Sequence, residues 1–207
     1  MRNPVLRLLI TLAITISIWN TSKGNDSLKY NISLNYYLDL SDTYGGGSLF
    51  AGEFSIQNSW YGASISYGHF LSHSIFNYSI NIEELNKTIY IPFDELTTMQ
   101  TASLSIKVIP IKTKIISSDL LFGLSYGYAK NSRFESVDYS YSLESNKFNY
   151  LYKDYKLFIK NHFGYQVGFN ISFFITKKFG LQLNSRIQDL SNGGTFFFIG
   201  SGIVFRL

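Results

Sequence analysis

The sequence predicts an all-β fold, an eight-stranded antiparallel up-and-down transmembrane β-barrel preceded by a cleavable N-terminal signal peptide. Three observations support this prediction. Apolar and polar residues alternate along most of the chain, the last such segment runs to the final residue, and the composition is 17% aromatic but only 15% charged. Because charged residues make up about 25% of an average soluble protein, we expect much of the surface to face an apolar medium.

The N-terminus has the organisation of a secretory signal peptide. Two arginines within the first seven residues form a short basic region, residues 8–19 are almost wholly apolar, and small residues precede the end of the segment at Gly24. The apolar run is shorter than the roughly 20 residues that a spanning helix needs. We therefore expect a signal peptide over residues 1–24 and a barrel domain over residues 25–207. An uncleaved inner-membrane anchor is the alternative.

The charge balance of the mature chain does not indicate a nucleic-acid partner. The full chain has a formal net charge of +4, but residues 1–24 contain three basic residues and no acidic one, which leaves +1. No basic stripe remains in the mature chain. The sequence contains no cysteine, so disulfides and thiolate metal sites are excluded. Without a metal-binding or phosphate-loop motif, we expect no metal and no cofactor.

Eight segments show the period-2 alternation of half-buried strands. In the first, Ile32 and Leu34 alternate with Ser33 and Asn35, which places apolar side chains on one face and polar side chains on the other. Eight strands is the smallest usual number for a membrane barrel, and an even number puts both termini on one side. The predicted strands cover residues 30–39, 50–57, 61–68, 102–108, 120–129, 163–173, 179–188 and 195–207.

The connections between these strands differ in length in a regular way. Residues 71–99 and 130–162 form two long connections, whereas residues 58–59 and 176–178 form tight turns. Barrels of bacterial outer membranes place tight turns on the periplasmic side and longer loops outside. We therefore expect both termini to be periplasmic and the two long connections to be extracellular loops.

The apolar face of the barrel is predicted to contact lipid. A soluble lipocalin-like barrel, the alternative, would turn its apolar face inward around a ligand. The polar face is instead rich in Gly and Ser and poor in the Lys and Glu of a solvated surface. Aromatic residues also gather at strand ends, as interfacial girdles require. The outer girdle is predicted to contain Tyr36, Phe50, Tyr67, Tyr126, Tyr128, Phe163, Tyr165 and Phe197, and the inner girdle Tyr30, Trp60, Tyr61, Phe173, Phe179 and Phe205.

The last strand has apolar residues at alternate positions, namely Ile203, Phe205 and Leu207. This spacing is similar to the C-terminal assembly signal of outer-membrane barrels, although the final residue is Leu207 rather than an aromatic one. In strand number, loop order and terminal strand, the mature region resembles the small OmpA/OmpX-type, porin-like outer-membrane barrels. The resemblance implies the outer membrane of a Gram-negative-type bacterium, contact with outer-membrane lipid, and recognition of this strand by the barrel-assembly machinery.

Four charged residues are expected on the interior face of the barrel, namely Glu53, Lys107, Arg186 and Arg206. Because a buried charge is costly without a partner, they should pair with one another, with interior amides or with water. Eight strands leave an interior just wide enough for side chains, which favours a static polar network. The alternative is a gated pore that opens by breaking a pair between Glu53 and Arg186.

The second long connection is rich in tyrosine and in alternating charges, a composition suited to binding an extracellular protein or glycan. The same residues also fit a hairpin formed by residues 138–143 and 150–157, which would need no ligand. The candidate contact residues are Tyr139, Tyr141, Tyr150, Tyr152 and Tyr155.

The sequence does not predict an enzyme. A lipid-modifying barrel hydrolase could use His69 or His73 with Ser72 or Ser74, but the His-x-Ser-Asn element of barrel deacylases is absent. A serine–histidine pair would also need an orienting third group. The predicted function is therefore a non-enzymatic outer-membrane barrel with an envelope-structural or surface-interaction role. The alternatives are the hydrolase and the soluble lipocalin-like barrel.

Overall fold

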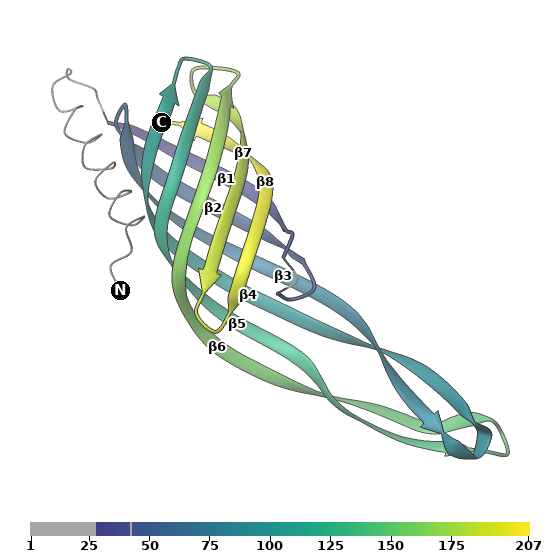
Figure 1. Ribbon diagram of the computed structural model, residues 1–207. Helices are drawn as coiled ribbons and strands as arrows, with labels where there is room; N and C mark the ends of the chain where they lie inside the picture. Colours follow the sequence, from purple (N-terminus) through teal and green to yellow (C-terminus); the bar gives the residue numbers. More distant parts are fainter. Residues whose placement is uncertain (1–27, 42) are drawn as a thin grey trace, which may run out of the picture.

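The computed structural model describes residues 28–41 and 43–207, so the signal peptide expected at residues 1–24 lies outside the described residues. Eight antiparallel strands form a closed barrel in which each strand pairs with the next and β1 pairs with β8 (Figure 1), as predicted. No helix within the described residues is long and apolar enough to cross a membrane. The strands are β1 (Lys29–Asp39), β2 (Gly47–Gln57), β3 (Tyr61–Ile82), β4 (Lys87–Lys112), β5 (Ile116–Ser142), β6 (Lys147–Phe174), β7 (Phe179–Leu190) and β8 (Gly194–Arg206), with one 3-10 turn, η1 (Glu83–Leu85).

The barrel wall has no free edge. Ile32 of β1, for example, lies opposite Phe54 of β2 on one side and Phe205 of β8 on the other. In lipid every backbone N–H and C=O must find its partner within the protein, and a closed ladder of strands meets that requirement.

The apolar face of the barrel points outward. Leu104, Ile106 and Leu124 are exposed by 63, 62 and 72%, whereas the intervening Ser103 and Ser125 are buried inside. The sequence alternation is therefore realised with apolar side chains on the outer surface and small polar side chains in the lumen. The lipocalin-like alternative is wrong, because it would need the opposite arrangement.

The two long connections are not loops. Residues 71–99 and 130–162 continue strands β3 to β6 well beyond the other strands and turn only at residues 83–86 and 143–146. Pairing within each hairpin satisfies the backbone groups that a long loop would leave to water. Asn86 and Asn146 have φ angles of 46° and 54° in these turns, a conformation that asparagine tolerates better than most residues. The hairpin considered for residues 138–143 and 150–157 is present, and the other long connection forms a second one.

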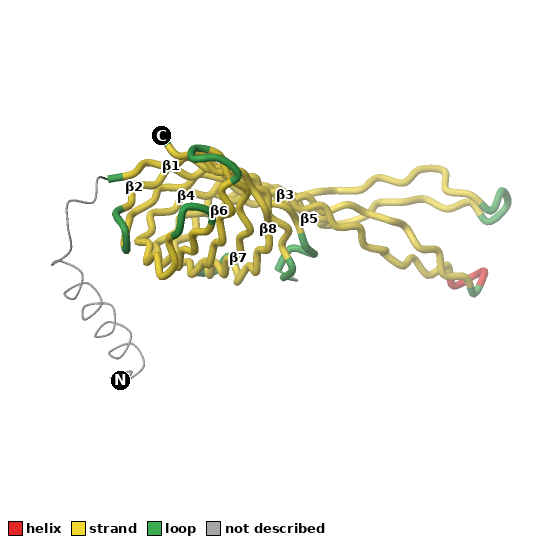
Figure 2. The backbone as a smooth tube through the Cα atoms, turned by 90° about the horizontal axis from the view of Figure 1, so that it is seen from above, coloured by secondary structure: helices red, strands yellow, loops and turns green. Residues whose placement is uncertain are grey.

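The two hairpins face each other as the layers of a small sandwich, which we call the arm (residues 72–96 and 132–158). Pairing between β4 and β5 stops at Leu96 and Ser132, and beyond that point the hairpins separate into two layers (Figure 2). Between the layers, Phe93 stacks on Phe134 with ring centroids 4.3 Å apart. We call the barrel end that carries the arm the arm end, and the opposite end, with the tight turns at residues 58–60, 113–115 and 175–178, the termini end.

Candidate functional site

The middle of the barrel lumen contains a cluster of four buried charges. Lys107 of β4 donates a hydrogen bond to Glu53 of β2 and also lies 3.6 Å from a carboxylate oxygen of Asp119 on β5. Arg186 of β7 reaches within 3.7 Å of the other Glu53 oxygen. Two positive and two negative groups thus meet away from solvent, so each charge has the partner that burial demands.

Tyr37 of β1 covers the arm-end side of this cluster. Its hydroxyl accepts a hydrogen bond of 3.2 Å from Arg186, whose guanidinium carbon lies 5.1 Å from the ring centroid. The cavity on the other side, toward the termini end, measures about 10 Å³, which is room for about one water molecule. The lumen around the cluster is therefore filled by side chains.

Arg206 does not join this cluster, although the sequence placed it in the same polar network. Its guanidinium carbon lies 3.2 Å from the ring centroid of Phe174 at the termini end, and the Arg206 side chain remains partly exposed. Arg206 lies close to the mouth of the barrel, at the last residue pair between β8 and β1, and it forms no ion pair with the carboxylates of the cluster among the described residues. Stacking of a guanidinium on an aromatic face takes the place of an ion pair.

Asp119 was missed from the sequence because it was assigned to the edge of a connection. A β-bulge between Val108 and Ile111 shifts the register of β4 against β5 at this point. Ser117, Ser118 and Asp119 are consequently buried in succession, without the alternation that marks a strand.

An aromatic plug closes the lumen at the arm end, where the sequence had predicted only a polar interior. Phe70, Phe196 and Phe198 are completely buried, and Phe70 makes edge-to-face contacts with both of the others, with ring centroids 5.4 and 6.1 Å apart. The alternation of the last strand puts Phe196 and Phe198 on its inner face, opposite in direction to Phe197, and this was the signal in the sequence that could have predicted them. The members of the plug are Tyr37, Leu49, Ala51, Phe70, Met99, Ala129, Leu190, Phe196 and Phe198, with Tyr44 packed against them.

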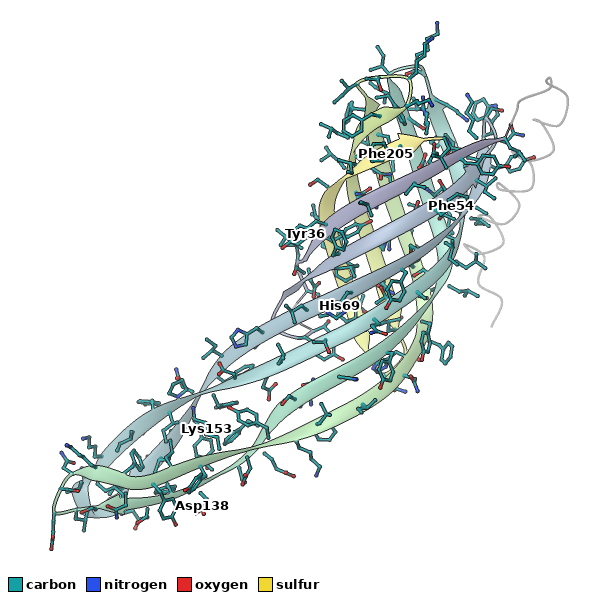
Figure 3. All side chains as sticks on the ribbon, turned by 180° about the vertical axis from the view of Figure 1, so that it is seen from behind. Tyr36, Phe54, His69, Asp138, Lys153 and Phe205 are labelled. Carbon is teal, nitrogen blue, oxygen red and sulfur yellow. The ribbon has the colours of Figure 1, made fainter. Side chains whose placement is uncertain are left out.

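The outer surface of the wall carries aromatic side chains near both of its ends. Tyr36 and Phe50 are opposite each other near the arm end, and Phe179 and Phe205 are opposite each other near the termini end, with ring centroids 5.2 Å apart. Figure 3 shows Tyr36 and Phe205 on the wall of the barrel, with Asp138 and Lys153 out on the arm. This arrangement is typical of interfacial girdles.

The alternate residues of the last strand lie on the outer face of the barrel. Phe205 and Leu207 are exposed by 39 and 70%, Ile203 is half-buried, and Arg206 between them points toward the lumen. The backbone N–H of Leu207 donates a 2.9 Å hydrogen bond to the Tyr30 carbonyl, which extends the β1–β8 ladder by one step.

The five candidate tyrosines of the arm have different environments. Tyr141 packs on Phe148 within the apolar core of the arm, and Tyr155 contacts Phe134 while its hydroxyl accepts a hydrogen bond from the Asp94 backbone N–H of the other hairpin. These two therefore hold the layers together. Tyr155 is nevertheless 41% exposed, and exposed rings are also present at Tyr139, Tyr150 and Tyr152.

Tyr150 and Tyr152 form a pair on the outer face of the β5–β6 hairpin. Their ring centroids are 5.6 Å apart, and Tyr152 is 65% exposed. The register places Tyr152 opposite Asp138, and Asp154 is the next residue of β6 on the same face. The pair is thus an aromatic surface bordered by carboxylates.

The histidines and serines of β3 do not form a catalytic pair. His69 and His73 point outward, whereas Ser72 lies on the inner face and donates, like Ser74, a hydrogen bond to the Tyr44 carbonyl. His73 Nε2 lies 3.2 Å from Asp94 on the exposed surface. No hydrogen bond between a serine and a histidine side chain is present in the described part of the chain.

Known proteins resemble this chain in fold. No family model and no curated protein matches the sequence. Among solved structures, the chain is similar to Ail, the attachment invasion locus protein of Yersinia pestis, in complex with the heparin analogue sucrose octasulfate (12% identity, TM-score 0.51, 89% of this chain and 100% of that chain). It is also similar to Neisserial surface protein A (9%, 0.53, 89% and 100%) and to the outer membrane protein OprG from Pseudomonas aeruginosa (8%, 0.52, 89% and 98%).

The chain therefore has the fold of the small eight-stranded outer-membrane β-barrels of the OmpA/OmpX type, as the sequence resemblance implied. At these levels of identity the likeness extends to the fold and no further.

Proposed function

We propose that the protein is a non-enzymatic β-barrel of the bacterial outer membrane, with both termini periplasmic and the arm at the cell surface. The exposed apolar wall and its two aromatic girdles support insertion in lipid. The tight turns lie together at the termini end, and outer-membrane barrels keep such turns in the periplasm. The arm then projects outward from the membrane.

The arm is the binding element of this proposal. The observation that carries it is the pair of exposed rings at Tyr150 and Tyr152, presented on a hairpin that the apolar core of the arm makes rigid. Exposed aromatic rings on an ordered surface suit sugar rings or a protein surface. The carboxylates of Asp138 and Asp154 beside them favour neutral or basic partners over anionic ones. We therefore infer that the arm binds an extracellular protein or a neutral glycan.

The lumen takes no part in this function. The neutral cluster around Glu53 and the aromatic plug above it together support a closed barrel. We propose that both are fillers that hold the eight strands in register, and that the protein conducts no ions in its resting state. The gated-pore alternative would require the cluster and the plug to open together.

The experiment that tests the binding proposal replaces both rings of the pair with serine. Cells that display the Tyr150→Ser/Tyr152→Ser variant should lose binding to host cells or arrayed glycans by about tenfold or more, since a hot-spot aromatic contributes about 2 kcal/mol. Tyr90→Ser is the matched control, because Tyr90 is 68% exposed on the outer face of the other hairpin. Substitution is preferable to deleting residues 136–154, which would uncover the apolar inner face of the β3–β4 hairpin.

Unchanged binding in the double variant, with the folded barrel verified by heat-modifiable gel mobility, would remove the tyrosine pair from the proposal. An equal loss in Tyr90→Ser would show that the arm binds without preference for this face. If the wild-type protein bound no cell or glycan, only the envelope-structural role would remain.

A further inference from the structure

A cavity of about 120 Å³ lies at the arm end of the barrel, directly above the aromatic plug. Tyr44 from the β1–β2 loop forms one side, the base of the β5–β6 hairpin forms another, and Asn192 from the β7–β8 turn forms a third. The cavity is several times larger than the roughly 10–15 Å³ that holds one water molecule, so a group of several heavy atoms fits. None of the lining residues is acidic.

Two cationic side chains stand at the mouth of this cavity. Arg133 and Lys160 line it, are exposed to solvent, and form no ion pair with any described residue. Lys156, which lies opposite Arg133 across the hairpin, instead pairs with Glu135 at 3.0 Å. Lys156 shares this face of the hairpin with Arg133, because directly opposite residues of an antiparallel pair point to the same side, but among the described residues only Lys156 has a carboxylate partner.

The floor of the cavity contains a buried histidine with one nitrogen unused. His162 is 1% exposed, and its Nδ1 lies 2.9 Å from the Ser191 carbonyl oxygen. Because a carbonyl only accepts, Nδ1 carries a proton, and Nε2 is left to accept from a hydroxyl or, when the ring is protonated, to donate to an oxyanion. Nε2 has no partner within the described residues, and neither has the buried Oδ1 of Asn131.

The β7–β8 turn holds the His162 ring in place. A Cβ added at Gly193 would lie 2.9 Å from the ring, so only glycine allows the turn to approach so closely. A fixed imidazole with an unsatisfied buried nitrogen costs stability unless something bonds to it. Position, burial and charge thus all point to a polar, anionic occupant.

We propose that this cavity binds a phosphate or sulfate ester, carried by a soluble sugar or by a lipid headgroup, between Arg133 and Lys160 at its mouth and His162 at its floor. Guanidinium and ammonium groups are the usual partners of such oxyanions. Asn131 Oδ1 accepts from a hydroxyl, and the sugar of such an ester supplies hydroxyl groups in addition to the oxyanion. Burial raises the pKa of Tyr44 more than Arg133 lowers it, so this hydroxyl stays a donor.

The test uses the full-length barrel in detergent micelles, titrated calorimetrically with glucose 6-phosphate, inorganic phosphate and glucose. Glucose 6-phosphate should bind saturably and more tightly than phosphate, and glucose should give no saturable heat. Arg133→Gln and Lys160→Gln should each weaken binding by about tenfold or more. Lys130→Gln, the matched control, removes a lysine that points outward over the Tyr128 ring and should change affinity by less than about twofold.

Three results would overturn the proposal. They are the absence of saturable binding for every probe, equal losses in Lys130→Gln and Lys160→Gln, and equal affinity for glucose and glucose 6-phosphate. Nanodiscs that contain lipopolysaccharide with or without its lipid A phosphates distinguish the two sources. Competition by the phosphorylated form supports a lipid headgroup, and unaltered glucose 6-phosphate binding supports a soluble ester.

NMR of the histidine rings tests whether the ligand contacts the floor of the cavity. The chain has three histidines, and glucose 6-phosphate should shift the ring signals of His162 while leaving those of His69 and His73 in place. Binding without a His162 shift would overturn the assignment of the cavity floor. This proposal rests on the proposed function only in that the arm end must face outside for a ligand to reach the cavity. The Tyr150→Ser/Tyr152→Ser variant should still bind glucose 6-phosphate normally. The two proposals can therefore fail separately.

Discussion

Lys107 of β4 and Glu53 of β2 form an ion pair in the lumen, with their side chains only 3 and 4% exposed. Asp119 and Arg186 complete a cluster in which the charges balance. The pair joins β2 to β4 across the intervening β3, so it adds a contact between two strands that share no backbone ladder.

Glu53→Gln should destabilise the barrel strongly. It leaves Lys107 and Arg186 with only one carboxylate between them, and an uncompensated buried charge costs about 3–5 kcal/mol. Urea unfolding of the barrel in lipid vesicles measures this loss. Glu53→Gln combined with Lys107→Met, which restores neutrality, should recover part of it. A single variant as stable as the wild type would mean that water already screens the cluster.

Phe198→Ala should cost far more stability than Phe197→Ala, although the two residues are neighbours. Phe198 is completely buried in the plug, so its removal leaves a cavity and costs about 3–5 kcal/mol. Phe197 is 39% exposed on the outer face, where lipid can fill the space. Equal losses in the same unfolding assay would count against a packed plug.

Phe205→Lys should block assembly of the barrel in cells, whereas Phe179→Lys should not. The two side chains are opposite each other at the same depth, so lipid penalises both charges alike, by about 0–1 kcal/mol near the interface. Only Phe205 belongs to the predicted assembly signal. Heat-modifiable gel mobility of outer-membrane fractions gives the folded yield, and a matching drop in both variants would leave the signal without support.

Phe134→Ala should loosen the arm without affecting the barrel. Phe134 contacts Phe93 and Tyr78 of the other hairpin, with ring centroids 4.3 and 5.4 Å apart. Without it, amide hydrogen exchange should quicken over residues 72–96 and 132–158 while the wall stays protected. Tyr90→Ala, which removes an exposed ring, is the control. Unchanged exchange in the arm would mean that the hairpins are ordered independently.

Much of the barrel could be predicted from the sequence because each strand of the wall has one apolar and one polar face. The same alternation continues into the arm, where residues such as Ile80 and Ile91 face another hairpin rather than lipid. Parity does not distinguish those two environments, so the arm was predicted as loops. Parity also placed Glu53 and Lys107 in the lumen, but their meeting depends on register across an intervening strand, and Asp119 was hidden by a bulge.

The cavity at the arm end could not be predicted from the sequence, for a related reason. Tyr44, Arg133 and His162 come from segments far apart in the chain, and only closure of the barrel brings them together. His162 falls within residues 130–162, which were predicted to form a loop, although it alternates in phase with the buried Gln166 on the same strand.

The central claim, that the barrel wall lies in lipid and the arm outside it, is tested most directly by one pair of substitutions. Leu104 and Ile75 are exposed to the same extent, 63 and 64%, but Leu104 lies midway along the wall and Ile75 lies on the arm. In vesicle-inserted protein, Leu104→Arg should lower the unfolding free energy by about 2–4 kcal/mol and Ile75→Arg by less than about 1 kcal/mol. Small and equal losses at both positions would contradict the account.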